Sequence, residues 1–589
     1  MRALSALAVA LFLTGTDALA QSSSISPEDS SFIDPGREVD TRNREWARGV
    51  LNDQSGGGTD SVEVREAIES GNWERALELV RKQAGESPDG ERDPRLGLVE
   101  GRLLVALGDA WTAKQVYGRL LDDPEVGGRA RAELHGFLIR RGEFDAADRL
   151  TEGAELSGSE LDPALATLRA SARAAEGRYS EAARLAGEGA LQGDPEASVL
   201  RANALLALGS DDEAESLYLG VLRESTHRKV RQAAHFGLGQ VARLRGSRAI
   251  RALQDERAVR LGPAPWAELD WGLALRALGR RDEARARLED VVSGYPELAS
   301  TARLGVARLD EEEGRAGDGL EALAAAVEGS LGDFLALTRL GELLLQEGLE
   351  DDGIEAHRAS LLLFPEFPAG RALLTRALTS RGRWDEAPAP DVAEGRWQLR
   401  GWTWDRLLDG DLPFYGLVAD RDSIPVDDPR RFVLALIHLR AGNAAGTLGW
   451  SDGAGVAQDG LLAIRAEALE LAGRPDEAVE IWETLFSAGQ GGPLVRERLA
   501  RLVFPTDPDR ALRLWREQFE RYPEFPRARL RMAEALEEAG NLEDAIDAYR
   551  GAETAGWLSP AEKRRIRVAI EDLDSLLQEQ EDARLDTGE

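Results

Sequence analysis

Apolar residues along the chain recur in paired runs whose spacing of three or four residues is typical of helices. In one such pair, Leu269 and Leu273 lie on the first run and Leu288 on the second, with Gly279 between the runs and Pro296 after them. Glycine ends a helix at little cost because it readily adopts the left-handed conformation, and proline can begin a helix but cannot continue one. The pattern therefore predicts a unit of two antiparallel helices.

The same unit recurs along the chain, with a turn glycine every 32–37 residues as far as Gly382. Five residues after the twelve turn glycines stand nine alanines, two glycines and one arginine, Arg251. A small side chain is expected there because two helices cross at short range. Within the unit that contains Gly279, Asp282 is predicted to cap the second helix. The twelve turn glycines are at positions 71, 108, 142, 177, 209, 246, 279, 314, 348, 382, 473 and 540.

The spacing Gly-x-aromatic-x-x-Ala resembles the tetratricopeptide repeat, a helix–turn–helix unit of about 34 residues. The stretch GNLEDAIDAYRGA at 540–552 and the FPEF at 364–367 are also similar to that family. The resemblance covers residues 61–387 and 461–556. It implies an all-α fold, a right-handed α-solenoid (superhelix) of about 12–13 repeats in which each repeat contacts mainly its neighbours. The aromatic position is filled by Trp73, Phe144, Tyr179 and Trp384.

The resemblance also implies where partners would bind, because in this family the first helices line a concave face that commonly holds peptides or partner proteins. Residues six positions before the turn glycines would face that groove. Asn203 is the single asparagine among them and lysine is nearly missing, so a clamp of paired Asn and Lys for a carboxyl terminus is not supported. The arginines could contact a partner or form ion pairs with acidic residues of neighbouring repeats. The candidate partner-binding residues of this set are Arg102, Asn203, Gln240, Arg308 and Arg376.

The repeat pattern is interrupted over residues 388–460, which hold Trp397, Trp402 and Trp404 within eight residues. One interpretation is that these aromatic side chains fill a joint between two parts of the array. Another is that Trp402 and Trp404 form an exposed shelf for a glycan or for an extended segment of a partner, and a third is a small catalytic domain. Gly442 is a candidate for a further turn glycine.

The N-terminal sequence MRALSALAVALFLTGTDALAQ has one arginine, an apolar run over Ala3–Leu13 and small residues before Gln21. This layout is typical of a signal peptide over 1–20 and predicts export to the periplasm or cell surface of a bacterium. Residues 21–60 are rich in Ser, Gly and Asp, which predicts a disordered leader. Beyond the repeats, residues 557–589 are predicted to form a capping helix with an acidic tail.

Charge and composition narrow the possible functions. The chain has 106 acidic against 73 basic residues and a formal net charge of -33, which repels phosphate backbones and argues against nucleic acid as a partner. Cysteine is absent, and the five histidines are scattered without a metal-binding or catalytic motif, so no cofactor is expected. After the N-terminal run, no apolar stretch is long enough to span a bilayer.

Together these features predict a non-catalytic protein–protein interaction scaffold of the bacterial cell envelope that binds partner proteins or peptides in the concave groove. Two alternatives stay open. The first is a scaffold component of an exopolysaccharide export machine, with a glycan or an export-machinery protein as partner. The second is a glycan-processing hydrolase with its site in 388–460.

Overall fold

The computed structural model describes most of the chain as stacked helix pairs. The described residues are 62–70, 72–85, 93–151, 163–191, 193–327, 332–388, 397, 403–412, 420–522, 525, 527–553 and 560–587. Within these ranges the chain forms 29 α-helices and no β-strand. The predicted signal peptide, the predicted leader and Trp402 lie outside the described residues.

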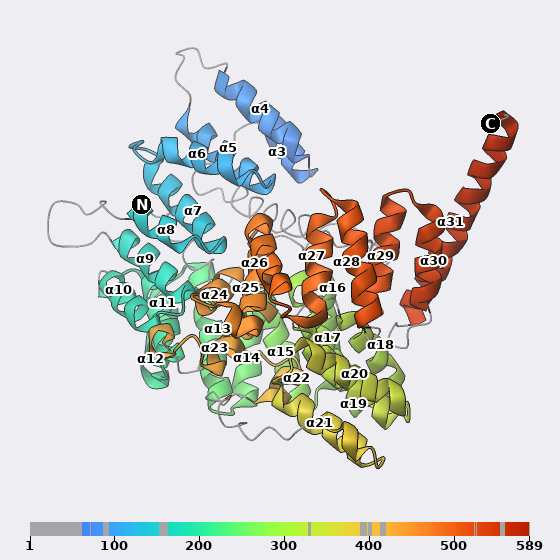
Figure 1. Cartoon of the computed structure of the whole chain (residues 1–589). Helices are drawn as coiled ribbons and strands as arrows, with labels where there is room; N and C mark the ends of the chain where they lie inside the picture. Colours follow the sequence, from blue (N-terminus) through green and yellow to red (C-terminus); the bar gives the residue numbers. More distant parts are fainter. Residues whose placement is uncertain are drawn as a thin grey trace.

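Nine helix pairs and one further helix make up the first part of the fold, which we call the first array (Figure 1). Consecutive helices pack against each other along it. Its helices are α3 (Val62–Glu69), α4 (Trp73–Gly85), α5 (Pro94–Ala106), α6 (Ala110–Leu120), α7 (Gly127–Arg140), α8 (Phe144–Thr151), α9 (Pro163–Ala175), α10 (Tyr179–Leu191), α11 (Pro195–Ala207), α12 (Asp211–Glu224), α13 (Arg228–Leu244), α14 (Arg248–Arg260), α15 (Pro265–Ala277), α16 (Arg281–Gly294), α17 (Pro296–Glu312), α18 (Ala316–Ala326), α19 (Asp333–Gln346), α20 (Glu350–Leu363) and α21 (Pro368–Thr379).

The remaining helices form two groups. The middle segment, residues 403–450, holds one short helix and one compact pair, and the second array follows it to the last long helix. The middle-segment helices are α22 (Trp404–Leu408), α23 (Pro429–Arg440) and α24 (Ala444–Trp450). The second array consists of α25 (Asp459–Leu471), α26 (Pro475–Ser487), α27 (Gly492–Val503), α28 (Pro508–Arg521), α29 (Arg527–Glu538), α30 (Leu542–Glu553) and α31 (Pro560–Thr587).

The turn glycines explain the regular reversal of the chain. Eleven of the twelve predicted positions are described, and all eleven have φ between 67° and 86°. At Gly279 the backbone N–H donates to the carbonyl of Arg276 at 2.9 Å, and the N–H of Arg280 donates to that of Leu275 at 3.0 Å. These two bonds satisfy the last carbonyls of α15 in the manner of a Schellman motif. Gly442, between α23 and α24, has φ 66° and is a further such turn.

The prediction that Asp282 caps α16 is wrong. The helix begins at Arg281 after Arg280, and no side chain bonds to its first N–H groups. The helix starts two residues earlier than predicted, since Arg280 stands at the cap position directly after the glycine turn. Asp282 lies in the first turn instead, where its charge complements the helix dipole.

The small residues of the repeat lie where helices cross. Ala284, five residues after Gly279, is fully buried, and so are its counterparts in seven other units. On the first helix of that pair, a Cβ at Gly272 would come within 2.9 Å of the Leu288 side chain. The close approach leaves no room for a larger residue. Those seven counterparts are Ala76, Ala113, Ala147, Ala182, Ala214, Ala478 and Ala545.

The first array curves so that the later parts of the chain lie against its inner side (Figure 1). In the middle segment, α22 contacts α19, α23 contacts α17, and α24 contacts α7 and α9. In the second array, α27 contacts α20. The largest buried apolar cluster accordingly draws residues from all three parts of the chain. The open concave groove that the resemblance implies is therefore largely covered by the protein itself.

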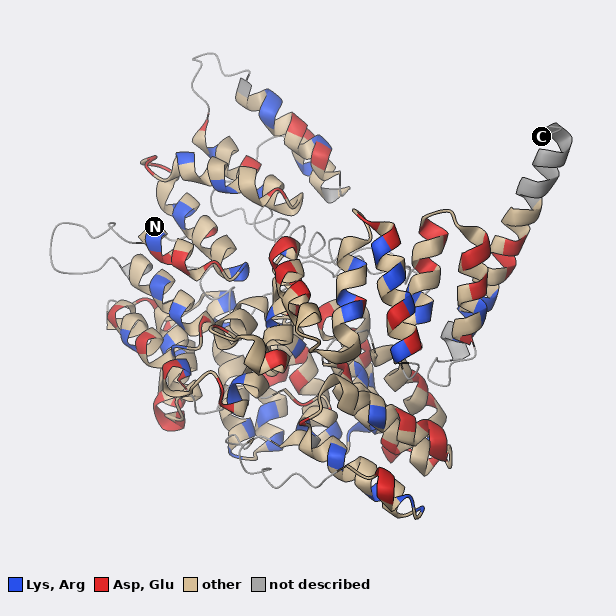
Figure 2. Cartoon of the chain, viewed as in Figure 1, with Lys and Arg blue, Asp and Glu red and all other residues tan. Residues whose placement is uncertain are grey.

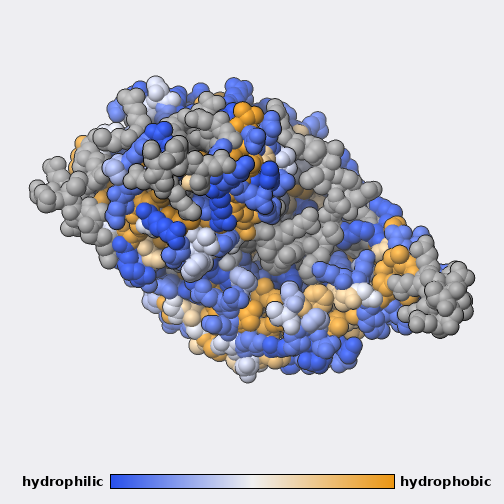
Figure 3. Space-filling model, turned by 90° about the horizontal axis from the view of Figure 1, so that it is seen from above, coloured by the Kyte–Doolittle hydropathy of each residue, from blue (hydrophilic) through white to orange (hydrophobic). Residues whose placement is uncertain are grey.

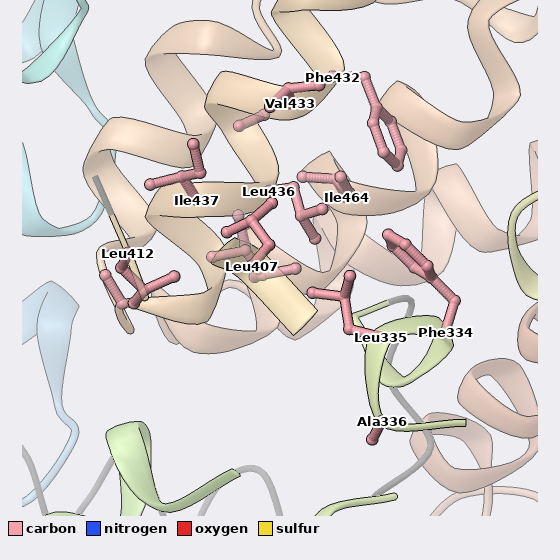
Figure 4. Close-up of a cluster of buried hydrophobic side chains, with 14 of the residues drawn as sticks. Phe334, Leu335, Ala336, Leu407, Leu412, Phe432, Val433, Leu436, Ile437 and Ile464 are labelled. Atoms are coloured by element: carbon pink, nitrogen blue, oxygen red, sulfur yellow. The ribbon is translucent and has the colours of Figure 1, made fainter. Parts of the chain in front are cut away.

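Leucines and aromatic side chains of the middle segment fill this shared core. Leu407 of α22 and Leu436 of α23 point into the space beside Leu335 of α19, with Ile464 of α25 next to them (Figure 4). All four side chains are at most 1% exposed. Burying a leucine or isoleucine side chain stabilises the fold by about 1.5–3 kcal/mol. The middle segment is thus part of the hydrophobic core of the protein.

Both basic and acidic residues occur along most of the described helices (Figure 2). Seen from above, hydrophilic side chains dominate, with smaller hydrophobic areas between them (Figure 3). None of the described helices is both long and apolar enough to cross a membrane.

Candidate partner-binding surface on the inner face of the first array

The inner face of the first array is the surface on which the sequence places partner contacts, and the middle segment is seated on it. A Cβ at the turn residue Gly142 would overlap the Leu448 side chain, and one at Gly177 would lie 2.7 Å from the indole of Trp450. Gly449, which lies between Leu448 and Trp450 in the sequence, packs against the backbone of Glu176. Two turns of the first array thus hold α24 in contact that only glycine permits.

Hydrogen bonds between the turns add to this contact. The guanidinium of Arg141 donates to the carbonyl of Gly473 at 3.0 Å, and that of Arg474 donates to the carbonyl of Arg141 at 2.8 Å. The backbone N–H of Arg421 donates to the carbonyl of Gly177 at 2.9 Å. Segments more than 240 residues apart in sequence are therefore joined by hydrogen bonds to backbone carbonyls, two from arginine side chains and one from a backbone N–H.

The first candidate residue, Arg102 of α5, is fully buried. Its Nη2 lies 2.7 Å from Glu133 Oε1 and its Nε donates to Glu133 Oε2 at 3.0 Å. Tyr117 donates its hydroxyl to the same carboxylate at 3.2 Å, and Arg129 lies 3.0 Å from it. Arg102 therefore connects its own repeat to the next one, and in this arrangement its guanidinium does not face solvent.

Asn203 and Gln240 are also buried and bonded within the protein. The Tyr218 hydroxyl donates to Asn203 Oδ1 at 2.6 Å, and Gln240 Nε2 donates to Asp270 Oδ2 at 2.8 Å. Asp270 lies 30 residues after Gln240, as Glu133 lies 31 residues after Arg102. Arg102 and Gln240, each six positions before a turn glycine, thus bond to an acid of the following repeat.

Arg308 and Arg376 are less buried and form weaker contacts. Arg308 pairs with Glu311 at 2.6 Å and approaches Asp409 of the middle segment at 3.7 Å. Arg376 lies 3.8 Å from Glu342 of the preceding repeat, and its side chain is 75% exposed. Of the described candidates, Arg376 is the one that remains open to a partner.

The tryptophans of the interrupted stretch lie in an aromatic cluster. Trp404 is 7% exposed and meets the ring of Phe367 edge-on, with 4.8 Å between centroids. Trp397 meets Phe364 edge-on at 5.5 Å and is 2% exposed. The described tryptophans of this stretch therefore fill the joint between the arrays, and Trp404 forms no exposed shelf here. Trp402 lies outside the described residues.

Sequence reasoning missed a buried polar cluster on the inner face, which centres on Asp411 just after α22. Its Oδ1 lies 3.1 Å from Nη2 of Arg243 and 3.3 Å from Nη2 of Arg251. Its Oδ2 accepts a hydrogen bond of 2.7 Å from Nε of Arg406. Arg251 also binds Asp270 at 2.5 Å. A carboxylate of the middle segment thus enters a pair of arginines on the first array.

The charges around Asp411 decide its ionisation. Burial alone would raise the pKa of Asp411, but the positive charges of Arg243, Arg251 and Arg406 outweigh it and hold the pKa well below its usual range. Burial alone would lower the pKa of Arg251, but the carboxylates of Asp270 and Asp411 raise it. Burial lowers the pKa of Arg243. The cluster therefore stays charged, and the Asp411 carboxylate takes the place of water as the partner of both guanidinium groups.

One signal in the sequence pointed to this cluster. Arg251 is the single large residue among the twelve positions five residues after a turn glycine, and it is the residue that contacts Asp411. A guanidinium at a position of close helix crossing must have an acidic partner nearby. Its partner Asp270 in the next repeat could have been inferred, whereas Asp411 lies 160 residues away.

Beside this cluster, Asp255 is fully buried, and neither carboxylate oxygen has a hydrogen-bond partner. Burial and the nearby charge of Asp270 raise its pKa well above the usual value. Gly239 makes room for it, since a Cβ at that position would overlap the carboxylate. Asp255 is thus an acid with a raised pKa in the wall behind the arginine pair, with its Oδ2 4.0 Å from Nε of Arg251.

Among the described residues, the histidines and acids show no arrangement for binding a metal ion. The described residues contain no group of three or more His, Asp or Glu that could hold a metal ion. Burial lowers the pKa of His135, His357 and His438 to about 4 in each case, so these rings are neutral at physiological pH. What the described inner face can do chemically is bind carboxylates through arginine, as it does with Asp411.

A family model described as "Tetratricopeptide repeat" matches residues 167–228, 269–333 and 506–560. Among solved structures, a chain of the APC/C hetero-tetramer Cut9–Hcn1 is 12% identical, with 91% of this chain and 98% of that chain covered and a TM-score of 0.32. The TPR domain of P58(IPK) is 16% identical, with 77% and 98% covered and a TM-score of 0.23. No curated protein matches the sequence.

The three matched segments lie over the helix pairs from α9 to α12, from α15 to α18 and from α28 to α30. Each contains turn glycines with positive φ or a buried alanine five residues after the turn position. Three segments of the chain therefore match the tetratricopeptide repeat, and the helix pairs between them repeat the same turn glycines and buried alanines.

Proposed function

We propose that this protein is an exported, non-catalytic scaffold of the bacterial cell envelope that binds other proteins. One observation carries the proposal: the first array already holds a polypeptide segment on its inner face, namely the described residues 403–412 and 420–450 of its own chain. The segment is held by a carboxylate bound between two arginines, by glycine turns against which side chains of α24 pack closely, and by a shared apolar core. These are the means by which one protein recognises another.

The occupied inner face changes where partners are expected. A groove partner would have to displace a segment that contributes buried leucines and tryptophans, so we place partner binding on the surfaces that the chain leaves uncovered. Arg376 and the outer helices of the pairs belong to these surfaces. The N-terminal sequence MRALSALAVALFLTGTDALAQ supports the envelope as the location.

Capture of partners from envelope extract tests the scaffold. The chain from Gln21 onward is immobilised and incubated with extract of the source bacterium, and the bound proteins are identified by mass spectrometry. We expect one or a few envelope proteins in every replicate. The matched control is the same protein heated above its unfolding temperature before capture, which keeps the charge and removes the surfaces. Equal recovery on both would contradict the proposal.

The location needs its own measurement. Fusion of residues 1–30 to a reporter that is active only outside the cytoplasm is expected to give activity, and a fusion that begins at Gln21 is not. Activity from neither fusion would contradict export while leaving the scaffold untouched. The exopolysaccharide-export and hydrolase alternatives stay predictions. Capture of export proteins would support the first, and turnover of a glycan with no captured protein would support the second.

A further inference from the structure

Several buried polar atoms between α13 and α14 form no hydrogen bond with any described residue. The acceptors among them are both carboxylate oxygens of Asp255 and Oε1 of Gln240, and the donors are Nε and Nη1 of Arg243. Asp255 and Gln240 are fully buried, and the Arg243 side chain is 2% exposed. Buried polar groups in folded proteins nearly always have a protein atom or an ordered water molecule as partner. These atoms therefore require a partner that the described part of the chain does not supply.

The packing of α13 against α14 brings these atoms together. On α13, Arg243 lies three residues after Gln240 and four after Gly239, so the three positions share one face of the helix. Asp255 of α14 lies against this face, because a Cβ at Gly239 would come within 2.3 Å of its Oδ1. Burial is the largest cause of the raised pKa of Asp255, and the positive charge of Arg243 opposes it at short range. The unpaired donors and acceptors thus lie within one helix pair.

Ion pairs enclose this place. Arg251 donates to Asp270 through Nε at 2.9 Å and through Nη2 at 2.5 Å. Asp270 also accepts a hydrogen bond of 2.8 Å from Nε2 of Gln240. On the side of the middle segment, Asp411 lies 3.1 Å from Nη2 of Arg243 and 3.3 Å from Nη2 of Arg251. The unpaired atoms therefore lie behind a wall of paired charges, out of contact with solvent.

The mixture of donors and acceptors decides which species can bind there. A cation would suit the unpaired oxygens, but the guanidinium groups beside them repel it and the N–H groups of Arg243 stay unpaired. An anion would suit Arg243, but it meets the carboxylates of Asp255, Asp270 and Asp411. Water is neutral and can both donate and accept hydrogen bonds, so it satisfies the two kinds of atom together.

We propose that α13 and α14 enclose a hydration site in which one or more ordered water molecules bind between Asp255, Gln240 and Arg243. The water accepts from Nε or Nη1 of Arg243 and donates to the carboxylate of Asp255 or to the side-chain carbonyl of Gln240. Arg243 also binds Asp411, so the same guanidinium contacts both the water and the middle segment. This inference is independent of the proposed scaffold function.

A crystal structure of the full chain from Gln21, at a resolution that shows ordered water, tests the site directly. We expect density for at least one water molecule about 2.7–3.2 Å from Nε or Nη1 of Arg243 and from an oxygen of Asp255 or Gln240. Crystals soaked in bromide or in rubidium are the control, since either ion gives an anomalous signal, and we expect no anomalous peak at this place.

Three outcomes of the crystallography would overturn the inference. A bromide or rubidium peak between Asp255 and Arg243 would show an ion site. Direct hydrogen bonds among Asp255, Gln240 and Arg243 would leave no atoms for water to bind. Well-defined side chains with no density between them would show a dry site.

Two substitutions at Asp255 test the site in solution. Asp255→Asn keeps a polar group and is expected to keep the water, whereas Asp255→Leu has a similar size, removes both acceptors and is expected to lose it. Oxygen-17 relaxation dispersion measures the number of long-lived water molecules, which we expect to fall by about one or two in Asp255→Leu alone. Equal numbers in the wild type and Asp255→Leu would contradict the site. Circular dichroism melts confirm folding, and if Asp255→Leu does not fold, the wild-type crystal structure decides.

Discussion

Removal of the Asp411 carboxylate is the sharpest test of how the middle segment is held. The Asp411→Ala change leaves Arg243, whose side chain is 2% exposed, without its acidic partner. Breaking a buried ion pair costs about 3–5 kcal/mol. Arg251 keeps Asp270, and Arg406 is 32% exposed and can be hydrated, so we expect the lower end, about 3 kcal/mol.

Hydrogen exchange measured by mass spectrometry detects this loss of stability segment by segment. Peptides from residues 403–450 are expected to lose protection by about a hundredfold in the variant, while peptides from α29 and α30 stay unchanged. The matched control is Asp409→Ala, two residues away. Asp409 lies 3.2 Å from Arg276 and is 26% exposed, and its loss is expected to cost about 0–1 kcal/mol. Equal effects of the two variants would refute the buried ion pair as the fastening of this segment.

Three further changes have defined outcomes. Gly142→Ala is expected to lower the melting temperature more than Gly279→Ala does, because both have positive φ but only the Cβ at 142 would also overlap Leu448; equal shifts in thermal melts would contradict the seating of α24. Glu133→Ala removes the carboxylate that binds the buried guanidinium of Arg102 and is expected to cost about 3 kcal/mol, seen as faster hydrogen exchange confined to α5–α8. His135 has a pKa of about 4 in the folded protein against 6.5 when unfolded. As the pH falls from 6.5 to 4, the unfolded state therefore binds a proton at His135 before the folded state does, and the protein loses stability over that window. His135→Leu is expected to reduce the slope of the denaturation midpoint against pH.

Local features of this fold could be predicted from the sequence. The turn at Gly279 and the buried Ala284 depend on residues within a few positions of each other, and both were placed correctly. Gly442 was identified in the same way although the surrounding pattern had decayed. The error at Asp282 concerns one residue at a helix start, where the glycine motif displaced the expected cap.

The candidate site could be predicted only in part, because its contacts depend on the curvature of the whole array. Ion pairing between neighbouring repeats was one of the two interpretations of Arg102, and the structure shows it. That Asp411 would meet Arg251 could not be derived, since the meeting requires several repeats to turn the chain back on itself. For the same reason, Trp404 could not be assigned to a joint or to a surface from the sequence alone.

The contact between the turn at Arg141 and the turn at Gly473 sets a limit on how this protein can change in length. In an open stack of repeats, a unit gained or lost leaves every other interface intact. Here the two turns meet through hydrogen bonds from the arginine side chains of each turn to backbone carbonyls of the other, after the chain has curved back on itself. An added or deleted unit between them would rotate one meeting face away from the other. The number of repeats between these turns is therefore fixed by closure, and variation in length is confined to the two ends.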